Sequence, residues 1–160
     1  MPTTAKAIAF RDETVVPALN AISLYSQAAA ELLLGTALQE SKLVYRRQIG
    51  GGPARGLFQM EMPTHDDIFT NYLKYRSTLR NAVLQLKSSP TAKAVDELTD
   101  NDAYATAMAR VLYKRAPKAL PKAGDVAAMA AYWKQYYNTP LGAGTVDQYI
   151  ASWSSVMGAA

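Results

Sequence analysis

Glu40 is the residue whose type and position are best suited to chemistry. It ends a run of mostly apolar residues and shares one face of a predicted helix with Leu33, Thr36 and Ala37. Burial and the negative end of the helix dipole both disfavour a charged carboxylate there, so both raise its pKa. A carboxylic acid that keeps its proton near neutral pH can act as a general acid. The alternative is a solvated glutamate in the last turn of a surface helix.

A glycine-rich segment follows this helix. Three successive glycines at residues 50–52 precede Pro53, and Gly56 lies three residues further on. These residues cannot continue a helix, so residues 42–63 are predicted to form a loop. A loop of this length inside a compact domain is usually functional.

The remaining sequence favours an all-α fold, because apolar residues recur with helical spacing and no long alternating β-branched run occurs. We expect a compact single domain of about six to eight helices at residues 17–160, preceded by an N-terminal arm at residues 1–16. The expected helices span residues 17–29, 30–41, 65–87, 102–116, 125–137 and 145–157. Thr64 is the expected cap of the third of these helices, and Asp100-Asn101 is the expected cap of the fourth.

The composition excludes several classes of protein. The chain has 160 residues, 49% of them hydrophobic, which is typical of a folded domain with a substantial core. Because it has no cysteine, disulfide scaffolds, thiolate zinc sites and cysteine nucleophiles are excluded. The single histidine, His65, follows a predicted cap and is expected at the surface. Neither a metal site nor a cofactor is therefore predicted.

The N-terminal residues lack the apolar core of a signal peptide, and no stretch is long enough to span a membrane. We therefore expect a chain that is made in the cytoplasm without a signal peptide and does not insert into membranes. The net charge is +4, with basic residues grouped at 46–47, 74–80 and 114–122. A basic surface suits an anionic partner, either nucleic acid or an acidic cell-wall polymer. No helix-turn-helix pattern is visible, so no specific nucleic-acid partner is expected.

Three short segments are distinctive when they are taken together. They are Ala37-Leu38-Gln39-Glu40-Ser41, then Gly52-Pro53-Ala54-Arg55-Gly56-Leu57-Phe58-Gln59-Met60, and then Tyr137-Asn138 with Gly142, Gly144 and Val146. They are similar to a helix that ends in Glu-Ser, a Gly-x-x-Gly-Leu-Met-Gln loop and a Tyr-Asn-Ala-Gly-Pro-Gly-x-Val turn. In this order they resemble the lysozyme-like lytic transglycosylase superfamily, especially its small bacteriophage members, over residues 18–150. The glycines of the third segment are spread apart by Thr139-Pro140-Leu141.

The resemblance implies a lysozyme-like fold with a glycine-rich active-site loop. It also implies cleavage of the β-1,4 bond between N-acetylmuramic acid and N-acetylglucosamine in peptidoglycan, whose glycan strands are the expected partner. Glu40 is the implied general acid and base, and no cofactor is implied. The candidate substrate-binding residues are Ser41, Gln59, Glu61, Tyr137 and Asn138.

Hydrolase and transglycosylase chemistry are both open. A transglycosylase needs one carboxyl group, which protonates the glycosidic oxygen and then takes a proton from the muramyl 6-hydroxyl. Hydrolysis with inversion needs a second carboxyl group about 6.5–9.5 Å away. Glu61, Asp66 and Asp67 are the candidates, although Asp66 and Asp67 fit the dipole of the following helix better.

Other residues also have two interpretations. Gln59 can bind the hydroxyl and N-acetyl groups of a sugar or tie the loop together. Ser41 can bind near the Glu40 carboxyl group or simply end the helix. The aromatic cluster can stack on sugar rings or belong to the core, and the core is favoured; it comprises Tyr132, Trp133, Tyr136 and Tyr137.

Two functions from different classes follow from these patterns. The first is a phage-encoded enzyme that acts on the cell wall or in the periplasm, either as a free endolysin or as part of a virion. The second is a virion structural protein, of the tail or the interior, with a lysozyme-like fold and weak or lost activity. The altered third segment motivates the second hypothesis, and other virion proteins are further partners in either virion setting.

Overall fold

The computed structural model describes residues 1–158, and the chain is predominantly helical. No strand occurs among these residues, which contain only isolated β-bridges within the segment 47–60. The predicted all-α class is therefore confirmed. In chain order the elements are α1 (Thr4–Phe10), the π-helical turn η1 (Arg11–Val15), α2 (Val16–Ala21), α3 (Gln27–Ser41), α4 (Met62–Asn71), the 3-10 turn η2 (Leu73–Tyr75), α5 (Ser77–Leu84), η3 (Ala94–Asp96), α6 (Glu97–Asp100), α7 (Asp102–Lys114), α8 (Val126–Trp133), the π-helical turn η4 (Lys134–Asn138) and α9 (Val146–Met157).

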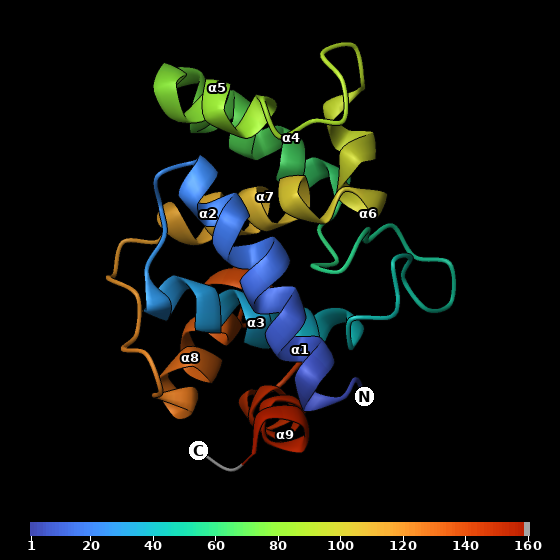
Figure 1. The fold of residues 1–160 in the computed structure, drawn as a ribbon, viewed down its shortest axis with the longest axis vertical. Coiled ribbons are helices and arrows are strands. Elements are labelled where there is room, and N and C mark those ends of the chain that lie inside the picture. Colours follow the sequence, from blue (N-terminus) through green and yellow to red (C-terminus); the bar gives the residue numbers. More distant parts are fainter. Residues whose placement is uncertain (159–160) are drawn as a thin grey trace.

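Two hydrophobic cores share the helix α7, which crosses the middle of the molecule (Figure 1). The lower core joins α1, α2, α3, α8 and α9, and the upper core joins α4, η2, α5 and α6. From α7, Ala109 and Tyr113 belong to the lower core, whereas Tyr104 and Met108 belong to the upper core. Because its buried residues face both groups of helices, α7 fixes the two groups relative to each other.

Helix α3 positions the predicted catalytic glutamate. Ser26 caps its first turn by accepting a hydrogen bond from the Ala29 amide, and the helix is buried along most of its length. It ends where Lys42 adopts a left-handed backbone conformation with φ of 55°. Glu40 therefore lies in the last turn of a rigid helix packed in the lower core.

Side-chain caps explain where the later helices begin, and the sequence predicts the first of them, at Asn101. The Asn101 side chain caps α7, and Asp125 caps α8. Thr145 and Gln148 form a reciprocal capping box at the start of α9. The predicted starts of these three helices are confirmed to within a residue.

The N-terminal arm expected at residues 1–16 is wrong. Helix α1 begins at Thr4, after the cap Thr3, and continues through η1 into α2, with Ala7 and Val15 fully buried. The prediction of one helix at residues 17–29 is also wrong. Helix α2 ends at Ala21, and a turn separates it from α3, which begins at Gln27. Packing of α1 and η1 against α3, α7 and α9 supplies the stability that the local sequence does not reveal.

The single helix expected at residues 65–87 is divided into α4, η2 and α5. It begins at Met62 with Pro63 in its first turn, and Thr64 is not its cap. Tyr72 and Arg76 have non-helical backbone angles, which separates the three pieces. No helix within residues 1–158 has the length and apolar character that a membrane crossing requires.

His65 is buried, which corrects the expectation of a surface residue. Its side chain is 3% exposed, and both ring nitrogens have partners. Nδ1 lies 2.9 Å from a carboxylate oxygen of Asp66, and Nε2 lies 2.8 Å from the hydroxyl of Tyr104. Burial is tolerated because these contacts replace the hydrogen bonds to water.

The segment between α3 and α4, residues 42–61, contains no helix, as predicted. The guanidinium of Arg46 forms two hydrogen bonds to the carboxylate of Asp102, at 2.6 and 2.9 Å. Gly56 has φ of 74°, and a Cβ atom there would lie 1.8 Å from the carbonyl oxygen of Leu98. These contacts fix the segment against α6 and α7, so it forms a stable wall beside α3.

Candidate active site

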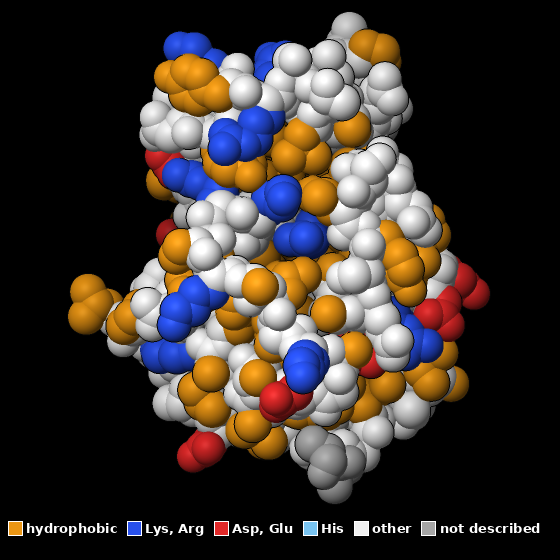
Figure 2. All heavy atoms as spheres, turned by 90° about the vertical axis from the view of Figure 1, so that its left-hand side faces the viewer, with side chains coloured by type: hydrophobic (Ala, Val, Ile, Leu, Met, Phe, Trp, Pro, Cys, Tyr) orange, Lys and Arg blue, Asp and Glu red, His pale blue; other side chains and the backbone are white. Residues whose placement is uncertain are grey.

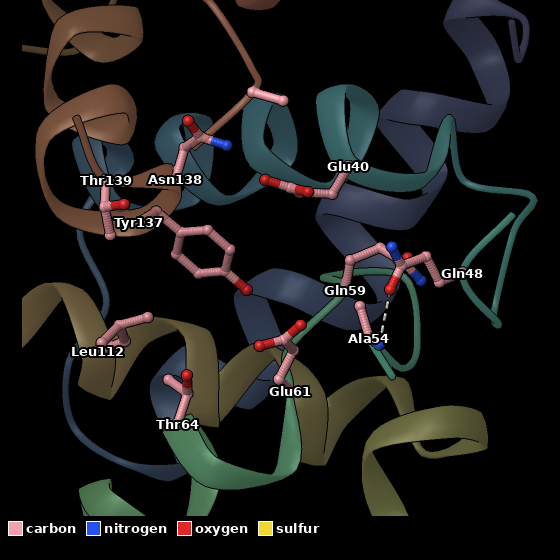
Figure 3. Close-up of a pocket in the computed structure, with 11 residues that line it drawn as sticks. Glu40, Gln48, Ala54, Gln59, Glu61, Thr64, Leu112, Tyr137, Asn138 and Thr139 are labelled. Carbon is pink, nitrogen blue, oxygen red and sulfur yellow. Dashed lines mark hydrogen bonds between the residues drawn. The ribbon is translucent and has the colours of Figure 1, made fainter. Parts of the chain in front are cut away.

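A polar cleft of about 500 Å³ lies between the two groups of helices. Glu40 enters it from α3, Glu61 from the start of α4 and Tyr137 from η4, while Gln59 enters from the loop (Figure 3). The remaining lining residues are Gln48, Ala54, Thr64, Leu112, Asn138, Thr139 and Ala143. Five of the six predicted site residues thus meet in one cleft, although they come from distant parts of the chain.

The carboxyl group of Glu40 points into the cleft (Figure 3), and the residue is half-buried. Its Oε1 accepts a hydrogen bond of 2.9 Å from the indole Nε1–H of Trp133, the one hydrogen bond that its carboxyl group makes within residues 1–158. Burial raises the pKa of Glu40 from 4.5 to about 7, against the lowering effect of the Trp133 hydrogen bond. The raised pKa predicted from the sequence is therefore present.

Trp133 is a residue of the candidate site that the sequence did not identify as a partner of Glu40. It lies at the end of α8, is 1% exposed, and packs against the ring of Tyr149. The close approach of Gly144 makes room for it, since a Cβ atom at that glycine would lie 2.6 Å from the indole ring. No spacing rule could have found the pair, because 93 residues separate Trp133 from Glu40.

Tyr137 forms one wall of the cleft. Its hydroxyl donates a hydrogen bond of 2.6 Å to the carbonyl oxygen of Phe58, so it joins η4 to the loop. Burial, together with the charge of Glu40, holds the pKa of Tyr137 well above its usual range. The tyrosine is therefore a neutral positioning group beside Glu40.

The side-chain amides of Asn138 and Gln59 each form hydrogen bonds within the protein. The side-chain oxygen of Asn138 accepts a hydrogen bond of 2.7 Å from Lys134, whose ammonium also donates to the carbonyl of Gly142. The amide nitrogen of Gln59 donates to the carbonyls of Gly56 and Tyr45, so the loop-tying interpretation of Gln59 is observed. Within residues 1–158 each amide keeps one group without a hydrogen bond: the nitrogen of Asn138 and the oxygen of Gln59.

Glu61 lies across the cleft from Glu40 and is exposed (Figure 3). Its backbone begins α4 in an extended conformation, and its side chain makes no capping hydrogen bond. Within the described residues no cation pairs with it. Glu61 is thus a free carboxyl group facing Glu40 across the cleft.

Ser41 does not belong to the cleft, and its predicted contact with substrate is wrong. The side chain is 1% exposed, and its hydroxyl donates to the carbonyl of Leu57 at 2.7 Å. A second bond reaches the carbonyl of Ala37. Since α3 buries the face next to Glu40, Ser41 fastens the loop to the end of the helix.

Asp66 and Asp67 also lie outside the cleft lining. Asp66 contacts His65, and Asp67 accepts a hydrogen bond of 2.7 Å from Arg115. Neither lies in the first turn of α4, so the predicted helix-dipole role is wrong too. Of the aromatic cluster, Tyr132 and Trp133 belong to the lower core, as favoured, and Tyr136 packs against it.

The cleft holds no cluster of metal ligands, and none occurs elsewhere in residues 1–158. Comparisons with protein-family models, with curated proteins and with solved structures found no match to this chain. The chemistry of the site is therefore argued from its own geometry.

Proposed function

We propose that this chain cleaves the β-1,4 glycosidic bond between N-acetylmuramic acid and N-acetylglucosamine in peptidoglycan, with Glu40 as general acid and base. On this proposal the chain has a lysozyme-like fold, and residues 42–61 are its glycine-rich active-site loop. The chain would be a phage-encoded enzyme of the cell wall or periplasm. The resemblance of three separate segments to one superfamily supports the proposal, and all three contribute residues to the same cleft.

The observation that carries the proposal is the environment of Glu40. The carboxyl group is withdrawn from water, and within residues 1–158 it has one neutral hydrogen-bond donor and no cation paired with its anion. With a pKa near 7, about half of the molecules hold the proton at neutral pH and can deliver it. A carboxyl group kept only for stability would instead gain donors or face solvent.

The first step uses that proton. Glu40 protonates the oxygen that links the two sugars, the C1–O bond breaks, and positive charge develops on the muramyl ring. The newly formed carboxylate then stabilises this charge across the cleft. Glu40 alternates between acid and base with little free-energy cost because its pKa lies near the working pH.

The second step depends on the nucleophile. The muramyl 6-hydroxyl can attack C1 and return its proton to Glu40, which forms an anhydro ring. Alternatively, Glu61 can accept the proton of an attacking water from the facing wall, which completes a hydrolysis. The oxygen of Gln59 and the amide nitrogen of Asn138 suit the hydroxyl and N-acetyl groups of the bound sugars.

The test is digestion of purified peptidoglycan by the parent chain and by Glu40→Gln. We expect the variant to lose activity by a factor of about 10²–10⁴, the usual contribution of a general acid. Glu31→Gln is the matched control, because Glu31 lies on the same helix outside the cleft and an amide oxygen can still accept its hydrogen bond from Gly124. Equal digestion by parent and Glu40→Gln would contradict the proposal.

Mass spectrometry of the released fragments assigns the second step. Anhydro-muramyl ends identify a transglycosylase, and reducing ends identify a hydrolase. If the folded parent releases neither product from any wall preparation, the chain is not an enzyme of this class. The virion structural role then becomes the better hypothesis.

A further inference from the structure

The charges of this chain are unevenly distributed along the sequence. Residues 68–95 and 103–124 together contain ten of the 17 basic residues and none of the 13 acidic residues. These segments form η2, α5, most of α7 and the linker to α8. A separation of this kind concentrates positive potential on part of the surface, although the net charge is only +4.

The structure brings several of these cations together around Tyr72. The guanidinium of Arg76 lies 3.7 Å from the centre of the Tyr72 ring, and that of Arg115 lies 5.7 Å from it. Arg115 also pairs with Asp67 at 2.7 Å. Guanidinium groups from α7 and from the end of η2 thus meet over one tyrosine.

Arg110 adds a third guanidinium next to this group. It is 9% exposed, and its Nε donates to the carbonyl oxygen of Leu24 at 3.3 Å. No carboxylate pairs with it within residues 1–158. Burial lowers the pKa of Arg110 despite the nearby hydroxyls of Tyr132 and Tyr72. A buried cation without an anionic partner favours the approach of an anion.

We call this surface the basic face, and it comprises the exposed or half-buried side chains of Lys74, Arg76, Lys114, Arg115 and Lys118, with the buried Arg110 next to them on α7. Figure 2 views the side of the molecule on which α5, the end of α7 and the following linker lie in Figure 1. Lysine and arginine side chains run down this side, with few acidic side chains among them. Asp67 is the one carboxylate within residues 1–158 that pairs with a member of the basic face.

The basic face adjoins the cleft. Leu112 lines the cleft from α7, and Arg115, which caps the end of that helix in a helical backbone conformation, lies three residues further on the same side. Likewise Thr64 lines the cleft from α4, and Asp67, the partner of Arg115, lies one turn beyond it. A polymer that leaves the cleft at this end therefore reaches the arginines around Tyr72.

We propose that the basic face binds a phosphodiester polymer of the bacterial cell wall and holds the chain next to its glycan substrate. The choice of a wall polymer rests on the proposed function, whereas the preference for phosphodiesters rests on the side chains. Guanidinium groups match phosphate oxygens in geometry, and the flanking lysines add charge for a chain of repeated anions. Such binding is sequence-independent and weakens as salt rises.

Nucleic acid fits the same face less well. Binding of single strands depends on exposed aromatic rings on which the bases stack. Here Arg76 and Arg115 contact the Tyr72 ring, and within residues 1–158 Tyr75, 71% exposed, is the one largely exposed aromatic ring beside these cations. The face therefore offers charge but lacks a series of stacking surfaces.

The test measures binding of the Glu40→Gln chain to purified walls, so that cleavage does not interfere. One wall sample keeps its phosphodiester polymer, and the other has lost it through hydrofluoric acid treatment. We expect affinity to fall about tenfold on stripped walls, and by a similar factor on intact walls when Lys74→Gln and Lys114→Gln are combined. The double variant should also reduce the dependence of log affinity on log salt by about two.

The matched control combines Lys6→Gln and Lys42→Gln, which removes the same charge from exposed positions outside the basic face. Equal weakening by control and test variants, or equal binding to intact and stripped walls, would overturn the proposal. Tighter binding to a single-stranded DNA oligonucleotide than to intact walls would also overturn it and assign the face to nucleic acid. Cleavage of stripped walls by the parent chain tests the proposed activity of Glu40 and does not involve the phosphodiester polymer. Binding of Glu40→Gln to intact walls tests the basic face and does not involve cleavage. A failure of one proposal can therefore be told apart from a failure of the other.

Discussion

Glu40 in the cleft and Glu97 at the start of α6 are both withdrawn from solvent, but their surroundings differ. Glu97 is 7% exposed and accepts hydrogen bonds from the amide and hydroxyl of Ser88 and from the side chain of Asn101. Burial alone would raise the pKa of Glu97, but these hydrogen bonds outweigh it and the pKa is lowered. Among the described residues Glu40 has a single donor, the indole of Trp133, and burial raises its pKa to about 7.

The comparison shows that burial by itself does not decide the state of a carboxyl group. The hydrogen-bond donors and the charges around the group decide it together. At Glu97 the chain supplies hydrogen-bond donors from Ser88 and Asn101 to the carboxylate. These bonds join the segment after α5 to α6 and to the start of α7. In the cleft the chain leaves the anion with one neutral donor, which costs stability at neutral pH and keeps a proton available.

The largest expected difference between the two regions is in activity. Glu40→Gln should reduce peptidoglycan cleavage about 10²–10⁴-fold, whereas Glu97→Gln should leave the rate per folded molecule within about twofold. The assay must be normalised to folded protein, which circular dichroism measures. A comparable loss in both variants would mean that the cleft carboxyl group has no special role.

The second difference is in stability at alkaline pH. The folded state holds the Glu40 proton more tightly than the unfolded chain, so stability falls as pH rises from about 4.5 to 7. Glu40→Gln removes this loss and should raise the free energy of unfolding at pH 8 by up to about 3 kcal/mol relative to the parent. Urea denaturation at pH 4.5 and pH 8 measures it. Parallel stability curves for the two proteins would contradict the raised pKa.

The lowered pKa of Glu97 predicts the opposite pH dependence of the free energy of unfolding. Its pKa is lower in the folded state, so its contribution is present above the unfolded value of 4.5 and is lost as pH falls below it. Glu97→Gln should destabilise the fold at pH 7 by about 1–3 kcal/mol, because Ser88 and Asn101 would lose an ionised acceptor. Urea denaturation between pH 3 and pH 7 should show a flatter acid limb for this variant. If the stability of Glu97→Gln fell with decreasing pH as steeply as that of the parent, the lowered pKa of Glu97 would be contradicted.

The smallest expected effect comes from Trp133→Phe. The substitution removes the one donor to Glu40 and so raises the pKa of that carboxyl group further. The alkaline limb of the pH–activity profile should move upward by about one pH unit. Trp153→Phe, which changes a tryptophan of the same core outside the cleft lining, is the control for packing losses. Movement of the limb in both variants would assign the effect to packing.

Much of the local structure followed from the sequence. The all-α class, the helix with Glu40 in its last turn, the non-helical segment after it, the cap at Asn101 and the starts of α8 and α9 depend on neighbouring residues. The N-terminal helix was missed because α1 and η1 are stabilised by packing against distant helices. The break at Tyr72 was also missed, and there the ring contacts the nearby Arg76 and the distant Arg115.

The candidate site shows the same division. The sequence alone determined that Glu40 lies at the end of an apolar helix, because helical spacing within a few residues places it there. Only the tertiary structure decided that Trp133 donates to it, that Glu61 faces it and that Ser41 turns inward. The same holds for the arginines that meet over Tyr72. A pKa or a charged surface depends on atoms within a few ångströms, and those atoms come from residues that only the packing of helices brings together.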